Sequence, residues 1–340
     1  MPVTSREIRF KQRPTGIPTE ANFELSETSI LDPGEGEFVV RNIWMSVDPY
    51  MRGRMTEQKS YVTGFKLGEP LEGGCVGQVV ASRHPDFAEG DYVLSLLGWR
   101  EYWRSDGRGV TKVDASLAPL EAYLGPLGMP GLTAYAGMLR VAEVKQDDTV
   151  FVSAAAGAVG SVACQIGKIK GCKVAGSAGS EAKVRWLRET AGIDAAINYK
   201  QVPDLAGAVK EMCPTGIDVY YENVGGEHLE AALRNMNDFG RIAVCGMISQ
   251  YNEPVPPPGP RSLVLVIPRR LRIQGFIVTD HLDMQPDFLR DMAQWLATGR
   301  VKWAKTVVEG LERAPEAFIG LFHGENLGKM LVKIGPDTTG

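Results

Sequence analysis

Residues 149–155 set the tightest limit on the fold, because an apolar run there is followed at once by glycines and an amphipathic stretch. The run Thr-Val-Phe-Val-Ser-Ala-Ala predicts a fully buried strand, and residues 160–170 predict the helix after it. The same order repeats with a strand at 172–176 and a helix at 181–190. Alternating buried strands and helices are typical of an α/β domain with a parallel sheet.

This alternation continues further along the chain. We expect a strand at 217–222, a helix at 227–235 and another strand at 240–246. The sequence can supply six buried strands, so the predicted fold class is α/β with a doubly wound parallel sheet. The apolar run Leu263–Ile267 predicts a further strand, either inside the sheet or at an edge where two copies pair.

The N-terminal part of the chain has a different texture. Short apolar or alternating runs at 37–45, 77–81 and 91–97 are separated by glycine and proline, which predicts a small barrel or sandwich. A glycine-proline turn at 128–131 then precedes an amphipathic run in which Thr133 is a candidate helix start. We therefore expect a domain boundary near this turn.

Length and charge narrow the class of protein. At about 150 residues per domain, 340 residues favour two domains. A net charge of −4 gives no general attraction to nucleic acid or anionic lipid, so small molecules are the expected partners. The N-terminus lacks the apolar core of a signal peptide, and no stretch is long enough to span a membrane, so we expect a cytoplasmic protein.

Neither the cysteines nor the histidines indicate a metal centre. The five cysteines are odd in number, widely scattered and without C-x-x-C spacing, which also argues against a disulfide framework. The four histidines stand alone, without an H-x-x-x-H pair. We therefore expect no bound metal.

The strongest chemical motif, Ala155-Ala156-Gly157-Ala158-Val159-Gly160, lies between the first buried strand and its helix, as a dinucleotide-binding turn does. Gly157 would let the backbone approach a pyrophosphate, and Gly160 would let the helix pack closely on the strand. The helix N-terminus would offer N–H groups to phosphate oxygens. The first glycine of the usual motif is replaced by Ala155, and an ordinary tight turn is the alternative interpretation.

The residues after this turn favour NADP(H) over NAD(H). Enzymes that use NAD usually place an acidic residue about 20 positions later to bind the ribose 2′-hydroxyl. Here no acidic residue occurs between Asp148 and Glu181, whereas lysines and arginines are frequent. Lys183, in the first turn of the next expected helix, is the best candidate for a 2′-phosphate contact. A solvated helix face is the alternative role for these cations.

Seven ordered motifs resemble those of the zinc-independent medium-chain reductases, in particular the prostaglandin reductase, alkenal double-bond reductase and curcumin reductase group. The resemblance covers nearly the whole chain. It is carried by Val47-Asp48-Pro49-Tyr50-Met51-Arg52, residues 128–135, residues 154–160, Tyr221-Glu222-Asn223-Val224-Gly225-Gly226, residues 245–252, Gln274-Gly275-Phe276-Ile277-Val278 and residues 324–329.

The resemblance implies a GroES-like β-barrel substrate domain at 1–122 and 300–340, with a Rossmann NADPH-binding domain at 123–299. It also implies homodimers joined at the sheet edges of the Rossmann domains. The cofactor-binding residues that it implies are Gly157, Ala158, Val159, Gly160, Lys183, Tyr199, Asn223, Cys245, Gly246, Met247, Ile248, Ser249, Gln250, Tyr251, Phe276, Ile277, Val278 and Asn326.

The chemistry that follows is reduction of a conjugated C=C bond. Without a metal, reduction of an isolated carbonyl loses its main source of oxyanion stabilisation, whereas hydride addition to the β-carbon of an enone or enal needs hydrogen-bond donors for the enolate. Tyr251 is the first candidate donor, alongside a ribose hydroxyl, and a loop residue that only covers the cofactor is the alternative. Tyr50 is the second candidate, as a residue that shapes the substrate pocket, with core packing as its alternative.

Two other functions stay open from the sequence. A quinone oxidoreductase would share the metal-free architecture but reduce a different acceptor. A non-catalytic NADPH-binding protein is the second, because a fold does not fix a function.

Overall fold

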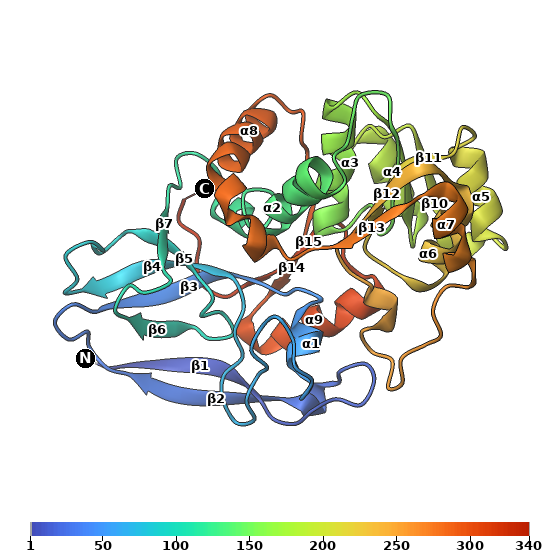
Figure 1. Ribbon diagram of the computed structural model, residues 1–340. Coiled ribbons are helices and arrows are strands. Elements are labelled where there is room, and N and C mark those ends of the chain that lie inside the picture. Colours follow the sequence, from blue (N-terminus) through green and yellow to red (C-terminus); the bar gives the residue numbers. More distant parts are fainter. Residues whose placement is uncertain (1, 340) are drawn as a thin grey trace. The chain divides into compact units, whose positions relative to one another are not determined.

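The computed structural model describes residues 2–339. Contacts within the chain divide it into two compact units, one of residues 2–125, 305–326 and 330–339, and one of residues 126–304 and 327–329 (Figure 1). Both units therefore draw on segments that are far apart in the sequence. No helix among residues 2–339 is long and apolar enough to cross a membrane.

The first unit consists mainly of antiparallel strands. A hairpin joins β1 to β2, and a seven-stranded sheet has the order β14-β15-β3-β4-β5-β7, with β6 paired to β3. Its strands are β1 (Val3–Phe10), β2 (Phe23–Ile30), β3 (Phe38–Ser46), β4 (Cys75–Ser82), β5 (Tyr92–Ser95), β6 (Tyr102–Ser105), β7 (Thr111–Val113), β14 (Lys305–Glu309) and β15 (Lys329–Lys333), and its helices are α1 (Met51–Arg54) and α9 (Ala314–His323). Strands β3, β4 and β5 cover the three runs that predicted strands.

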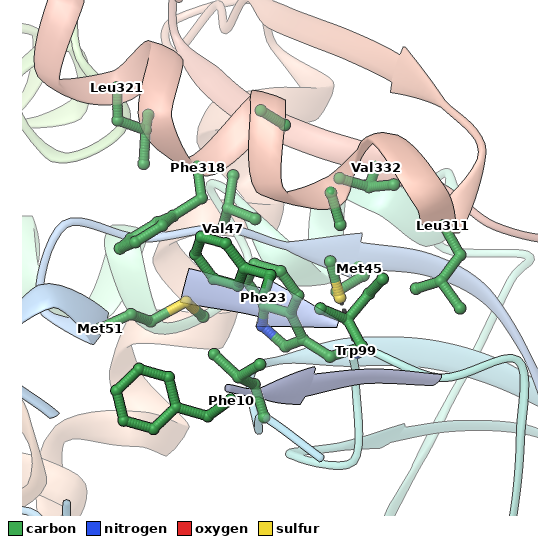
Figure 2. Packing of buried hydrophobic residues seen from close by; sticks show 14 of the residues in the cluster. Phe10, Phe23, Met45, Val47, Met51, Trp99, Leu311, Phe318, Leu321 and Val332 are labelled. Atoms are coloured by element: carbon green, nitrogen blue, oxygen red, sulfur yellow. Dashed lines mark hydrogen bonds between the residues drawn. The ribbon is translucent and has the colours of Figure 1, made fainter. Parts of the chain in front are cut away.

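The main core of this unit brings the two ends of the chain together. Figure 2 shows Phe318 of α9 beside Phe23 and Trp99, with Met51 to the left and Phe10 below. The rings of Phe23 and Trp99 stack at 5.9 Å, and Phe318 meets both edge-on. Such ring pairs add to the free energy of burial, so α9 belongs to this unit although about 200 residues separate it from Trp99.

The second unit is an α/β structure with six parallel strands. Its strands are β8 (Thr149–Val152), β9 (Lys173–Ala178), β10 (Ala195–Asn198), β11 (Ile217–Glu222), β12 (Met236–Val244) and β13 (Arg272–Gly275). Its helices are α2 (Met129–Ala136), α3 (Ala158–Ile169), α4 (Glu181–Glu189), α5 (Leu205–Met212), α6 (Gly226–Asn235), α7 (Val266–Arg269) and α8 (Gln285–Ala297). Strand β8 is buried throughout, as its unbroken apolar sequence predicts.

Strand order defines where this sheet can bind a ligand. The order β10-β9-β8-β11-β12-β13 starts at β8, runs outward to β10 and then restarts on the other side at β11. Every strand pair is parallel. This is the doubly wound order with its switch point between β8 and β11, and ligands bind outside the carboxyl ends of strands at such a point.

Two local predictions are wrong. Thr133 does not start a helix: Gly128 precedes the first turn of α2, and the Thr133 hydroxyl donates to the Met129 carbonyl at 2.7 Å. Pro130, which is suited to a first helical turn, sets the start instead. The run Leu263–Ile267 is helical rather than a strand, because it spans a 3₁₀ turn and the start of α7. The strand that follows this run is β13, which forms one of the two edges of the sheet.

Candidate cofactor site

The turn after β8 brings helix α3 unusually close to the strand. A Cβ atom on Gly160 would lie 2.4 Å from the carbonyl oxygen of Ala154, so only glycine fits there without a shift of the backbone. Gly157 precedes the first residue of α3, whose N-terminus points its backbone N–H groups out of the turn. On the other side of the turn, the Gly328 N–H donates to the Ala156 carbonyl at 2.8 Å. The turn thus has the shape and donors of a phosphate cradle.

Cations gather at the end of the neighbouring strand β9. Ser180 caps α4 by accepting a hydrogen bond from the backbone N–H of Lys183. Tyr199 and Lys200 follow β10, and a Cβ atom on Gly179 would lie 3.3 Å from both the Tyr199 hydroxyl oxygen and Lys200 Cε. Burial, together with the charge of Lys200, lowers the pKa of Lys183. An anion between these side chains would relieve that repulsion.

A buried hydrogen-bond network ties β8 to β11 at the switch point. The Ser153 hydroxyl donates to Glu222 Oε1 at 2.9 Å and accepts from the Asn223 N–H at 2.9 Å. Asn223 Nδ2 donates to the Ser153 carbonyl, and the Val224 N–H donates to Glu222 Oε1. Glu222 is 0% exposed, and burial raises the pKa of its carboxyl. The network fixes the orientation of Asn223 just beyond the carboxyl end of β11.

The loop 245–251 lies against this network. Its Ile248 N–H donates to the Asn223 carbonyl at 3.1 Å, and the Ser249 N–H donates to the Val224 carbonyl at 3.0 Å. The Ser249 hydroxyl donates to the same Val224 carbonyl. These bonds hold the loop along the carboxyl ends of β11 and β12, where a dinucleotide would lie.

Tyr251 folds back over the start of its own loop. Its hydroxyl oxygen accepts a hydrogen bond from the Met247 N–H at 3.2 Å, and a Cβ atom on Gly246 would lie only 2.8 Å from that oxygen. Glycine at 246 therefore allows the tyrosine to approach the backbone. Burial raises the pKa of the adjacent Cys245 to about 11, so this thiol stays protonated at neutral pH.

Phe276 continues the row of strand ends after β13. Its ring meets Tyr221 edge-on at 6.4 Å, and a Cβ atom on Gly137 would lie within 2.7 Å of both rings. Ile277 and Val278 follow it, and all three side chains are half-buried. The structure therefore places the predicted residues between 157 and 278 at the carboxyl ends of the strands of one sheet.

The two remaining predicted residues belong to the first unit. Tyr50 directly precedes α1 and packs against the core that Figure 2 shows. Burial and the charge of Asp48 raise the pKa of its hydroxyl. Asn326 is half-buried and lies two residues after Gly324, which ends α9 with a left-handed φ of 71°.

Three polar residues in this region were not predicted from the sequence. Lys200 lies just after β10, as Lys183 lies after β9. Its position at the end of a strand was the signal that could have revealed it. Ser153 and Glu222 end or follow adjacent strands, but their pairing depends on the sheet order, which spacing along the chain does not give.

The chain matches two protein families over most of its length. Residues 6–113 match a family described as the N-terminal domain of oxidoreductase, and residues 158–298 match one described as zinc-binding dehydrogenase. The NADPH-dependent curcumin reductase of Escherichia coli is 42% identical over 98% of both chains. The NADP(+)-dependent 2-alkenal reductase of Nicotiana tabacum is 43% identical, again over 98% of both chains.

The protein belongs to the medium-chain dehydrogenase/reductase family. A solved structure of CurA from Vibrio vulnificus in complex with NADPH has a TM-score of 0.93 and 42% identity, and it covers 98% of this chain and 100% of its own. The predicted resemblance to medium-chain reductases and the predicted two-part fold class are confirmed. No cluster of three or more His, Cys, Asp or Glu within residues 2–339 could hold a metal ion.

Proposed function

We propose that this medium-chain reductase is an NADPH-dependent enzyme that reduces the C=C bond of α,β-unsaturated ketones and aldehydes. The observation that carries the proposal is the glycine cradle at the switch point of the sheet, with Lys183, Tyr199 and Lys200 at the next strand ends. Relatives named as a curcumin reductase and a 2-alkenal reductase, both at 42% identity or more, support the same cofactor and substrate class.

The residues present fit a phosphorylated dinucleotide. The α3 N-terminus with Gly157, Ala158, Val159 and Gly160 would hold the pyrophosphate, because close backbone N–H groups face the phosphates there. Lys183 and Lys200 would bind the 2′-phosphate by charge-assisted hydrogen bonds. Asn223, the loop 245–251 and residues 276–278 would line the nicotinamide half. When bound, NADPH supplies the hydride that adds to the β-carbon.

Within this proposal Tyr251 donates a hydrogen bond to the oxygen of the enolate that develops on the substrate. A donor placed where negative charge develops is the main way to lower such a barrier without a metal. Tyr50 shapes the substrate pocket, and Asn326 contacts the cofactor. We further propose that the substrate domain is 1–122 with 300–340, that the NADPH domain is 123–299, and that turnover needs no metal.

The proposal is tested by following NADPH oxidation with four samples: a 2-alkenal, a benzylideneacetone-type enone, a quinone, and no acceptor. We expect turnover with the alkenal and the enone, and unchanged rates after dialysis against a chelator. Turnover with the quinone alone would indicate a quinone oxidoreductase. Binding of NADPH without turnover of any acceptor would indicate a non-catalytic protein, and no affinity for NADPH would end the proposal.

We also propose that the protein is a cytoplasmic homodimer. Strand β13 is the edge of the parallel sheet, all four of its residues are exposed, and Ile273 is 38% exposed. An edge strand has unpaired backbone groups along one side, which favours pairing with a second copy. Shortly before β13 in the sequence, the apolar side chains of Leu263, Val264 and Ile267 are also exposed.

A further inference from the structure

The ring of His228 touches a residue of the proposed 2′-phosphate site. His228 lies in the first turn of α6, and its imidazole meets the Tyr199 ring edge-to-face, with ring centroids 4.8 Å apart and planes at 78°. The histidine is 4% exposed, whereas Tyr199 is half-buried. Edge-to-face ring pairs of this geometry are attractive and restrict the orientation of both rings.

One of the two ring nitrogens of His228 is buried without a partner. Its Nε2 atom is buried and has no hydrogen-bond partner among the described residues. Burial lowers the pKa of His228 to about 4, so the ring is neutral at physiological pH. A buried nitrogen without a partner reduces stability, whereas the edge-to-face contact of the ring with Tyr199 is attractive.

Tyr199 also lies close to the turn after β9. Gly179 leaves room for Tyr199, because a Cβ atom there would lie 3.3 Å from the tyrosine hydroxyl oxygen and from Cε1. The next residue, Ser180, accepts the Lys183 N–H and so fixes the first turn of α4. Tyr199 therefore lies close both to the His228 ring and to the turn that precedes Lys183.

We propose that His228 is a positioning residue for cofactor selectivity: its ring holds Tyr199 against the Gly179 turn, in the orientation that flanks the 2′-phosphate. This proposal rests on the proposed function, which assigns that phosphate to Lys183 and Tyr199. Because only NADPH and NADP⁺ carry the 2′-phosphate, the contact strengthens their binding and leaves that of NADH and NAD⁺ unchanged.

The test uses His228→Ala, which removes the ring, and His228→Phe, which keeps a ring but removes both nitrogens. Leu229→Ala is the matched control, because Leu229 is the next residue of α6, is also buried, and packs in the core of the same unit. Dissociation constants for NADP⁺ and NAD⁺ are measured by titration calorimetry, and unfolding is followed by differential scanning calorimetry.

We expect His228→Ala to weaken NADP⁺ about 2- to 10-fold, the contribution of one edge-to-face ring pair, with NAD⁺ affinity unchanged. His228→Phe should restore the NADP⁺ affinity and melt no lower than the wild type. Leu229→Ala should lower the melting temperature and leave the ratio of the two affinities unchanged.

A wild-type affinity ratio in His228→Ala would overturn the proposal. So would a His228→Phe protein that binds NADP⁺ as weakly as His228→Ala, because the nitrogen rather than the ring would then be needed. Lys183→Ala separates this failure from that of the proposed function. If Lys183→Ala changes the ratio and His228→Ala does not, only the role of His228 falls; if neither does, the 2′-phosphate assignment falls as well.

Discussion

At the scale of single residues, the proposed function assigns the cofactor preference to Lys183 and Lys200. Each follows a strand of the same parallel sheet, and the charge of Lys200 contributes to the lowered pKa of Lys183. Two ammonium groups that repel each other gain more from a doubly charged phosphate than from a ribose hydroxyl. We therefore propose that the charge of these two lysines favours a cofactor with a 2′-phosphate.

Replacing Lys183 with alanine should raise the KM for NADPH about 10- to 100-fold, the value of one hydrogen bond between charged groups. The KM for NADH should change little, because no phosphate contact is lost. Steady-state kinetics with both cofactors measure the difference. Lys173→Ala, at the exposed start of β9, is the control for loss of one positive charge. Equal losses for both cofactors in Lys183→Ala would remove the assignment.

The hydroxyl of Tyr251 is the second residue whose role can be measured directly. Tyr251→Phe keeps the ring but removes the proposed donor, so we expect kcat to fall by up to about 10²- to 10³-fold, as for other oxyanion donors. The KM for NADPH should stay near the wild-type value. Tyr123→Phe, which loses a hydroxyl bonded to the Asp114 carbonyl, is the control. Unchanged turnover with every enone would mean that Tyr251 only covers the cofactor.

At the scale of elements, the close contact between α3 and the end of β8 depends on the absence of a side chain at Gly160. Gly160 allows the first turn of α3 to lie directly on the Ala154 carbonyl, where any Cβ atom would come within 2.4 Å. Ala154 itself has a positive φ of 47°, so the chain turns sharply to bring the helix N-terminus over the strand end. In the proposed function, the same close packing would place the backbone N–H donors for the pyrophosphate.

Gly160→Ala should therefore lower both stability and cofactor affinity. Overpacking of a tight contact typically costs about 1–3 kcal/mol, and α3 would have to move away from the turn. Thermal unfolding and NADPH titration measure the two effects. Gly53→Ala is the control, because its helical position in α1 has no atom within 4 Å of the added Cβ. Tight NADPH binding by Gly160→Ala would show that the cradle tolerates a side chain.

At the scale of the whole molecule, the open edge of the six-stranded sheet favours assembly. Strand β13 has a neighbour on one side only, and its exposed residues include the apolar Ile273. Pairing of β13 with β13 of a second copy would join the two six-stranded sheets into one continuous sheet.

Ile273→Lys should convert the proposed homodimer into a monomer, because a charge on an edge strand opposes pairing. Light scattering after size-exclusion chromatography gives the mass directly. Leu117→Lys, which replaces a 76% exposed leucine of the first unit, is the control and should stay dimeric. A dimeric Ile273→Lys protein would place the interface elsewhere, and a monomeric wild type would refute the homodimer.

Much of the second unit was predictable because each strand and helix is indicated by residues close together in the sequence. A buried strand such as Thr149–Val152 needs an unbroken apolar run, and a glycine turn must follow where a helix begins at once. The absence of acidic residues between Asp148 and Glu181 is likewise a property of the chain, and by itself it indicates a phosphorylated cofactor. The run Leu263–Ile267 was mistaken for a strand because short apolar runs do not distinguish helix from strand.

The amino-acid order alone determined the parallel α/β alternation, the cradle glycines and the cationic neighbourhood, because each depends on residues close together along the chain. Tertiary structure alone decided which strand ends meet. The bond between Ser153 and Glu222, the approach of Lys200 to Lys183 and the contact of His228 with Tyr199 all join residues separated by other elements. Their distances follow from sheet order and helix packing, which no local pattern encodes.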